Sequence, residues 1–115
     1  MHPVIKQIFK LSDDIRYVAI YQNGKLQMKS KSHTKNSSDN ESDKYEELLI
    51  NPLVLLATKQ RGEIDCGGLD YVLIRYGNFF QYVQPISCGH ISVCLDKDSD
   101  IKNLSLKIQN FCKNK

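Results

Sequence analysis

The chain has 115 residues, a length that suits one domain, and 41% of them are hydrophobic, enough to build a core. A formal net charge of +3 is too small to argue for a nucleic-acid or membrane-surface partner. No apolar run approaches the roughly 20 residues of a membrane span, and the first residues lack a signal-peptide pattern. We therefore expect a cytoplasmic domain whose four cysteines are reduced thiols.

The first third of the sequence predicts a short helix and a hairpin. Pro3 suits a first helical turn, and apolar spacing extends a helix over residues 3–12. Asn23-Gly24 predicts a tight type I′ turn between strands at 16–22 and 25–31, because both residues tolerate positive φ. The first of these strands is apolar on both faces, whereas the second is polar and suits a sheet edge. The polar segment 32–42 that follows is expected to be a mobile loop.

A helix is predicted next, from a cap at Ser42 or Asp43 to Gly62, with a kink or restart near Asn51 because Pro52 lacks a backbone N–H. On a helical wheel this segment is apolar on two sides, so we expect the first stripe to pack within the chain and the second to meet another molecule. The alternative is that the first helix or the loop at 32–42 covers the second stripe. The first apolar stripe is Tyr45, Leu48, Leu49, Pro52 and Leu56, and the second is Ile50, Leu53, Val54 and Ala57.

The last part of the sequence predicts three strands and a helix. The strands are expected at 68–76, 79–86 and 87–96, and the final helix at 100–115. The apolar stripe of this helix is Ile101, Leu104, Ile108, Phe111 and Cys112. The predicted order is thus α-β-β-α-β-β-β-α. This order favours an α+β fold with a five-stranded antiparallel sheet sandwiched by helices, forming one domain over residues 1–115.

The run DKDSD at 96–100 resembles the opening of an EF-hand calcium loop. Ile101 stands where that loop needs glycine, and Lys107 stands where it needs a bidentate glutamate. A strand, rather than a helix, is also expected before the run. We therefore interpret these carboxylates as the N-terminal cap of the last helix, and we expect no calcium site.

The second half of the sequence offers no convincing metal or catalytic site. Cys88, His90 and Cys94 share one face of a strand, but alternate strand residues lie nearly 7 Å apart, too far to bind one zinc ion together. No acid lies nearby in sequence to orient His90 for a cysteine nucleophile. We expect a helix to cover this strand face, and we expect neither a cofactor nor an enzymatic activity.

The chain resembles the roadblock domain of the dynein light chain class. The resemblance lies in the order of elements, the hairpin YVAIYQNGKLQMKS with Gly24 at its turn, the apolar helix, the strands of DYVLIRYGNFFQYVQPI, and the acid-capped final helix of GHISVCLDKDSDIKNLSLKIQNF. The pattern extends to the wider profilin-like and longin-like group and to some small archaeal proteins.

This resemblance implies a non-enzymatic homodimer that scaffolds or regulates a small Ras-like GTPase or a signalling complex. Roadblock domains pair through the central helix and the strand after it. Carried onto this chain, the dimer interface comprises Ile50, Leu53, Val54, Ala57, Tyr71 and Leu73. The alternative is a small-molecule sensing domain of the PAS or profilin-like type, with an aromatic cavity near Tyr71, Phe80 and Tyr82.

Overall fold

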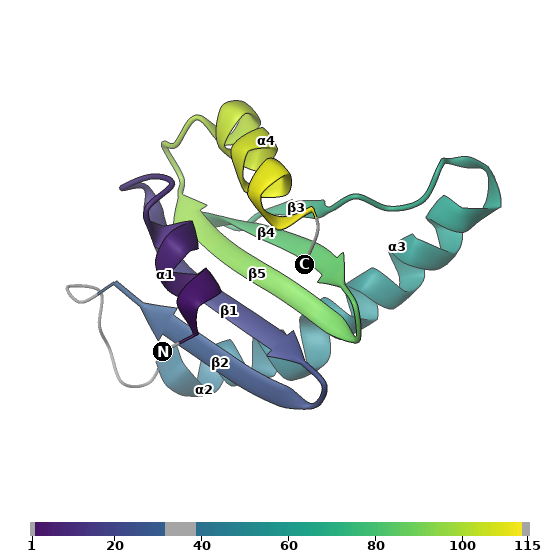
Figure 1. Cartoon of the computed structure of the whole chain (residues 1–115), viewed down its shortest axis with the longest axis horizontal. Helices are drawn as coiled ribbons and strands as arrows, with labels where there is room; N and C mark the ends of the chain where they lie inside the picture. The colour runs from purple at the N-terminus through teal and green to yellow at the C-terminus, as the bar shows by residue number, and fades with distance from the viewer. Residues whose placement is uncertain (1, 32–38, 114–115) are drawn as a thin grey trace.

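The computed structural model describes residues 2–31 and 39–113 and has three layers (Figure 1). The middle layer is one five-stranded antiparallel sheet with strand order β2-β1-β5-β4-β3. The five strands are β1 (Ile15–Gln22), β2 (Lys25–Ser30), β3 (Val72–Arg75), β4 (Phe79–Ile86) and β5 (Gly89–Asp96). This arrangement confirms the predicted fold class and places β2 at a sheet edge.

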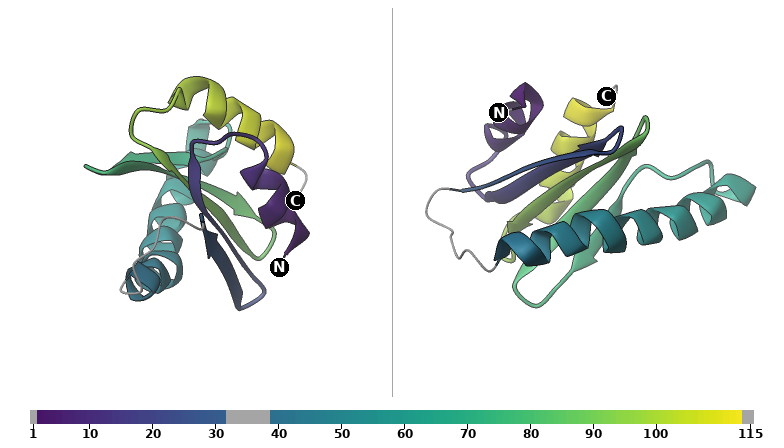
Figure 2. Two further views of the ribbon diagram at one scale, coloured as in Figure 1. Left: turned by 90° about the vertical axis from the view of Figure 1, so that its left-hand side faces the viewer. Right: turned by 90° about the horizontal axis from the view of Figure 1, so that it is seen from below.

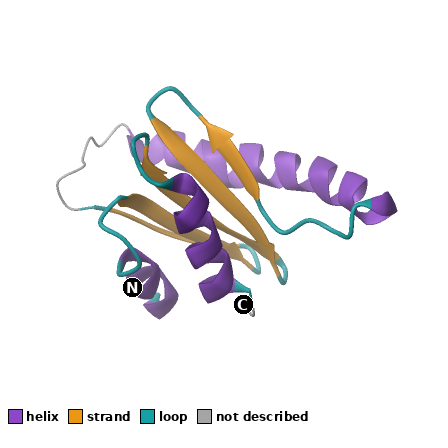
Figure 3. Cartoon of the chain, turned by 90° about the horizontal axis from the view of Figure 1, so that it is seen from above, coloured by secondary structure: helices purple, strands orange, loops and turns teal. Residues whose placement is uncertain are grey.

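Helices cover both faces of the sheet. The helices α1 (Pro3–Phe9) and α4 (Ile101–Cys112) lie on one face, as Figure 2 shows from two further directions. The other face is crossed by a long helix made of α2 (Asp39–Tyr45), a π-helical turn η1 (Glu46–Ile50) and α3 (Asn51–Asp65). The last turns of α3 extend beyond the sheet (Figure 3).

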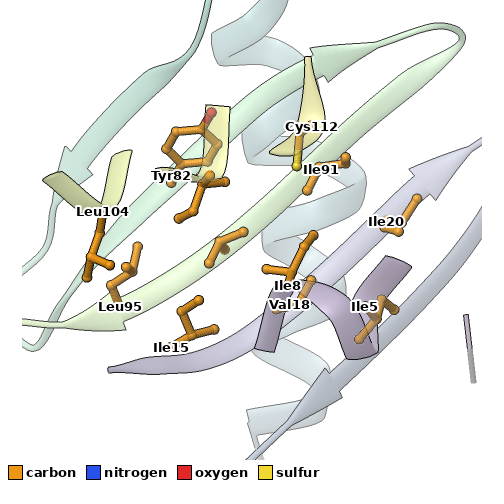
Figure 4. Close-up of a cluster of buried hydrophobic side chains, with 12 residues drawn as sticks. Ile5, Ile8, Ile15, Val18, Ile20, Tyr82, Ile91, Leu95, Leu104 and Cys112 are labelled. Carbon is orange, nitrogen blue, oxygen red and sulfur yellow. The ribbon is translucent and has the colours of Figure 1, made fainter. Parts of the chain in front are cut away.

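The hydrophobic core lies between the sheet and the pair α1 and α4. Alternation along the strands sends Val18 and Ile20 of β1, and Ile91 and Leu95 of β5, toward these helices (Figure 4). Ile5 and Ile8 of α1, and Leu104, Ile108 and Cys112 of α4, close the core from above. The apolar stripe predicted for the last helix is thus the one that packs on the sheet.

The first hairpin turns as its sequence predicts. Asn23 and Gly24 both have positive φ, at 55° and 79°, which the right-handed twist of the paired strands favours in a two-residue turn. Residues 32–38 of the expected loop lie outside the described residues. Residues 39–42 correct that prediction, because the helix begins at Asp39 and not at Ser42 or Asp43.

Other predicted boundaries also need correction. The first helix ends at Phe9, short of residue 12. Gly62 does not end the long helix, which continues to Asp65, and the positive φ of Gly67 (81°) ends it instead. Gly62 is needed for a close contact, since a Cβ there would lie 3.0 Å from the carbonyl carbon of Gly68.

The third strand is shorter than predicted, with only residues 72–75 paired. Gly67 and Gly68 both have positive φ, a backbone conformation that a strand does not adopt. The amide of Gly68 also donates to the carbonyl of Gly62 at 3.0 Å, which holds this segment against the helix and away from the sheet.

Pro52 interrupts the long helix in the predicted place. The proline has no N–H to donate to the preceding turn, and the backbone compensates with the π-helical turn immediately before it, where Asn51 N–H bonds to the carbonyl of Glu46. The helix continues as α3 with Pro52 in its first turn, a position where no donor is needed.

Candidate interaction surface and buried polar cluster

The outer side of the long helix carries a band of exposed apolar side chains. Of the eight large hydrophobic residues that are exposed in the described chain, six belong to this helix, and the other two are Leu73 and Leu106. Five of the six are closely spaced and form what we call the helix band: Tyr45, Leu48, Leu49, Leu53 and Leu56, with exposed fractions from 41% to 61%. An apolar surface of this kind on a small domain indicates a contact with another molecule.

The inner side of the same helix is largely polar. Glu47, Asn51 and Leu55 follow one another at intervals of four residues and point to the sheet, and all three are buried. The first apolar stripe was expected to pack within the chain. This expectation is wrong, because its members Tyr45, Leu48, Leu49 and Leu56 are exposed.

Glu47 is the centre of a cluster that joins the helix to two strands. Its Oε1 lies 2.8 Å from Nε2 of His90 and accepts from Nδ2 of Asn51 at 2.9 Å, while its Oε2 accepts from the hydroxyl of Tyr17 at 3.0 Å. Glu47 and Asn51 are fully buried, and His90 is 2% exposed. We call Tyr17, Glu47, Asn51 and His90 the buried polar cluster.

Burial determines which groups donate in this cluster. Desolvation, followed by the charge of Glu47, raises the pKa of Tyr17 far above its ordinary value, so its hydroxyl keeps the proton and donates it. A carboxylate that accepts three hydrogen bonds is satisfied while ionised, which offsets much of the cost of burying its charge. Among the described residues, the buried Oδ1 atom of Asn51 has no hydrogen-bond partner, so the hydrogen bonds that attach the helix to the sheet are not complete.

Glu46, which precedes Glu47 in the sequence, accepts hydrogen bonds from a residue outside the buried polar cluster. The hydroxyl of Tyr76 donates to its two carboxylate oxygens at 3.3 and 3.4 Å. Burial and then the charge of Glu47 raise the pKa of Glu46, which shows that keeping this carboxylate ionised is costly.

Within the part of the chain that the structure describes, cavities lie between the long helix and the sheet. One, of about 410 Å³, opens beside α3 at the end of the sheet where β4 turns into β5, and His90 and Tyr21 belong to its lining. The other, of about 340 Å³, lies near η1 and includes Tyr17, Glu46, Gln81 and Cys94. Neither is lined by Tyr71, Phe80 or Tyr82.

The structure separates the six residues of the predicted dimer interface. On the long helix, Leu53 is 54% exposed and Ala57 is exposed, whereas Ile50 and Val54 are half-buried. Tyr71 stacks on Tyr82, and Leu73 pairs with Tyr82 in the sheet, so these two lie on the α4 side of the sheet. One flat surface therefore does not contain all six residues.

The aromatic cavity expected under the alternative hypothesis does not form around Tyr82. This side chain is fully buried in the core, its ring stacks on Tyr71 at 4.8 Å between centroids, and its hydroxyl donates to Gln84 at 2.6 Å. Arg75 lies over the ring of Phe80 at 5.1 Å. These aromatic residues contact protein groups, as core residues do.

The cysteines and aspartates considered as sites are spread over the structure. Cys88 is exposed in the turn between β4 and β5, whereas the thiol of Cys94 donates to Gln81 at 3.1 Å. Desolvation and nearby carboxylates raise the pKa of Cys94, which keeps it in the unreactive thiol form. Asp100 precedes α4 and accepts from Asn103, and Asp96 lies 3.6 Å from Arg16. Within residues 2–31 and 39–113, no group of three potential metal ligands comes together.

Sequence reasoning located His90 but missed its partners. His90 occupies an inward position of β5, and a helix was expected to cover this strand face, but Glu47 was not among the candidate site residues. Glu47 and Asn51 are four residues apart, which is a usable signal for one helix face. The distance of 43 residues between Glu47 and His90 makes their contact invisible to local patterns.

No family model matches the sequence, and no curated protein matches it. Among solved structures, the chain is similar to a Roadblock/LC7 domain from Streptomyces avermitilis, with a TM-score of 0.69 and 11% sequence identity. The match covers 99% of this chain and 92% of that one. The part of the chain that the structure describes contains no helix with the length and hydropathy of a membrane span. The structural match shows that the chain has the fold of a Roadblock/LC7 domain over essentially its whole length.

Proposed function

We propose that this protein is a non-enzymatic interaction module that forms a homodimer through the long helix. The observation that carries the proposal is the helix band, in which five large apolar side chains are exposed on one continuous helix. From Asp39 to Asp65 this helix is about 40 Å long at 1.5 Å per residue, long enough to pair with a partner along its length.

A second copy of the chain is the occupant that best suits this surface. The band contains no charged side chain, so it offers no complementary charge by which to select a different partner. A two-fold axis would place the same apolar residues opposite one another, which satisfies both surfaces at once. Leu53, a residue of the predicted interface, lies within the band, and Ala57 continues it along α3.

In the dimer the protein would scaffold or regulate a small Ras-like GTPase or a signalling complex in the cytoplasm. This part of the proposal rests on the resemblance in sequence pattern and on the Roadblock/LC7 fold. Within the described residues the four cysteines form no disulfide, which is consistent with a reducing compartment. Binding of purified Ras-like GTPases, loaded with GDP or with a GTP analogue, measures whether one nucleotide state is preferred.

The dimer is tested by measuring absolute mass by light scattering after size exclusion, over a range of concentrations. The wild type is expected to be a dimer and Leu53→Asp a monomer, because the substitution would bury an unpaired charge in the interface. Leu106→Asp is the matched control, since Leu106 is similarly exposed (49%) but lies on α4, across the sheet. This control should remain dimeric.

Two results would contradict the proposal. A wild type that stays monomeric at every concentration would show that the helix band does not mediate self-association. A dimeric Leu53→Asp would show that the dimer forms through another surface.

A further inference from the structure

The larger of the two cavities has the composition of a small-molecule site. Apolar side chains form part of its lining, among them Pro52 and Leu55 of α3 and Pro85 of β4, and the polar side chains of Lys59, Gln60 and Glu63 form another part. Its volume of about 410 Å³ lies within the range of ligand pockets. Such pockets combine an apolar lining with a few well-placed polar groups, and here the buried polar group is His90.

Glu47 determines which nitrogen of the His90 ring donates a hydrogen bond and which one can accept. The carboxylate already accepts from Tyr17 and Asn51, and His90 Nε2 lies 2.8 Å from its Oε1, so Nε2–H is the donor of this contact. In a neutral imidazole the nitrogen that does not donate is an acceptor. Glu47 therefore orients His90 as a carboxylate orients a catalytic histidine, leaving Nδ1 with a free lone pair.

The Nδ1 atom of His90 lacks a hydrogen-bond partner among the described residues, yet it is not one of the fully buried unpaired atoms. The cavity that His90 lines gives access to the ring. An acceptor that is mostly removed from water and unpaired carries a free-energy cost, which a ligand with a donor at this point would relieve.

We propose that this cavity binds a small phenol-type molecule, with a flat apolar body and a hydroxyl that donates to Nδ1 of His90. The ring of Tyr21 lies 5.7 Å from that of His90, so a third ring could pack against an aromatic neighbour. An anion fits less well, because Glu47 lies behind the His90 ring, and Lys59 and Glu63 at the cavity offset each other.

The proposal is tested by titrating the full-length protein with p-cresol and with toluene, which has the same shape without the hydroxyl. Substituting His2→Gln and His33→Gln leaves His90 as the one histidine of the chain, so that ¹⁵N spectra of the ring report on it directly. p-Cresol should bind saturably, shift the Nδ1 signal, and bind about fivefold more tightly than toluene, the effect of one ordinary hydrogen bond.

Three results would overturn the proposal. They are equal affinity for the two compounds, an Nδ1 signal of a protonated nitrogen in the free protein, and p-cresol shifts that map away from Pro52, Leu55 and His90.

Leu56 belongs both to the helix band and to the cavity lining, so the titration is repeated on Leu53→Asp. The same preference for p-cresol is expected there. Failure of the dimer changes the measured mass and leaves this preference in place, whereas failure of the phenol site removes the preference and leaves the mass unchanged.

Discussion

At the scale of single residues, Gly89 is the described glycine at which an added Cβ would make the closest contact. It opens β5 and pairs with Gln22 of β1. A Cβ on Gly89 would lie 1.8 Å from the carbonyl oxygen of Tyr21 and 2.8 Å from Cα of Gln22. Both contacts are with backbone, which cannot move aside as a flexible side chain can. The close approach of β1 and β5 at this end of the sheet therefore requires glycine.

We expect Gly89→Ala to destabilise the protein by about 3 kcal/mol, the upper end of the usual cost of overpacking, because the two strands must separate at this point. Gly77→Ala is the control, since a Cβ on Gly77 would meet no atom within 4 Å. Urea denaturation of both variants measures the difference. Equal stabilities would mean that the β1–β5 contact yields more easily than its geometry indicates.

Glu46 is a residue whose charge opposes folding. Its raised pKa means that the folded state binds the proton more tightly than the unfolded state does. The folded protein therefore loses stability as pH rises from the ordinary glutamate pKa through the raised one, and the cost is complete above the raised pKa.

Glu46→Gln should stabilise the protein at pH 7 by up to about 1 kcal/mol, once solvent screening of this half-exposed group is allowed for. The gain in stability should disappear below about pH 4, where the Glu46 carboxyl is protonated and uncharged, as the glutamine side chain is. Thermal unfolding at several pH values checks this, with Glu41→Gln of the exposed α2 surface as a control of equal charge change. A gain that does not depend on pH would exclude the electrostatic explanation.

At the scale of elements, the long helix differs from α1 and α4 in how it is attached. The helices α1 and α4 pack on the sheet with isoleucines, a leucine and Cys112. The long helix instead turns Glu47, Asn51 and one leucine, Leu55, inward, and its other four leucines are exposed. Its π-helical turn lies where Glu47 meets His90 and Tyr17. π-Helical turns often accompany functional sites, and here the turn brings a carboxylate under the helix.

At the scale of the whole molecule, the two faces of the sheet differ in how much apolar surface their helices bury. The face under α1 and α4 has a continuous hydrophobic core (Figure 4). The face under the long helix has a polar attachment and an apolar outer surface, so packing against another molecule would add the apolar burial that this layer lacks.

The stability of the wild type should consequently depend on protein concentration. A tenfold rise should increase the melting temperature by roughly 3–5 °C, because association draws the equilibrium toward the folded dimer. The melting temperature of Leu53→Asp should not change with concentration. Calorimetry over two decades of concentration measures both, and parallel behaviour of the two proteins would argue against a folding-coupled dimer.

Local sequence patterns determined the elements and hence the fold class. Asn23-Gly24 specified the first hairpin, two-residue alternation specified which residues of β5 share a face, and the spacing of Leu104, Ile108 and Cys112 specified the face of α4. Each of these signals acts within a few residues, so a sequence contains it completely.

Only the tertiary structure decided which side of the long helix faces the sheet. A wheel drawn at the regular α-helical spacing fails across the π-helical turn before Pro52, because this turn changes the angle between the residues on either side of it. The wheel also assumed that apolar residues face the sheet. Glu47 is instead buried there, because Tyr17, Asn51 and His90 come together around it. The buried polar cluster brings together residues up to 73 positions apart, from Tyr17 to His90, which both contact Glu47. It exists only once the sheet has formed.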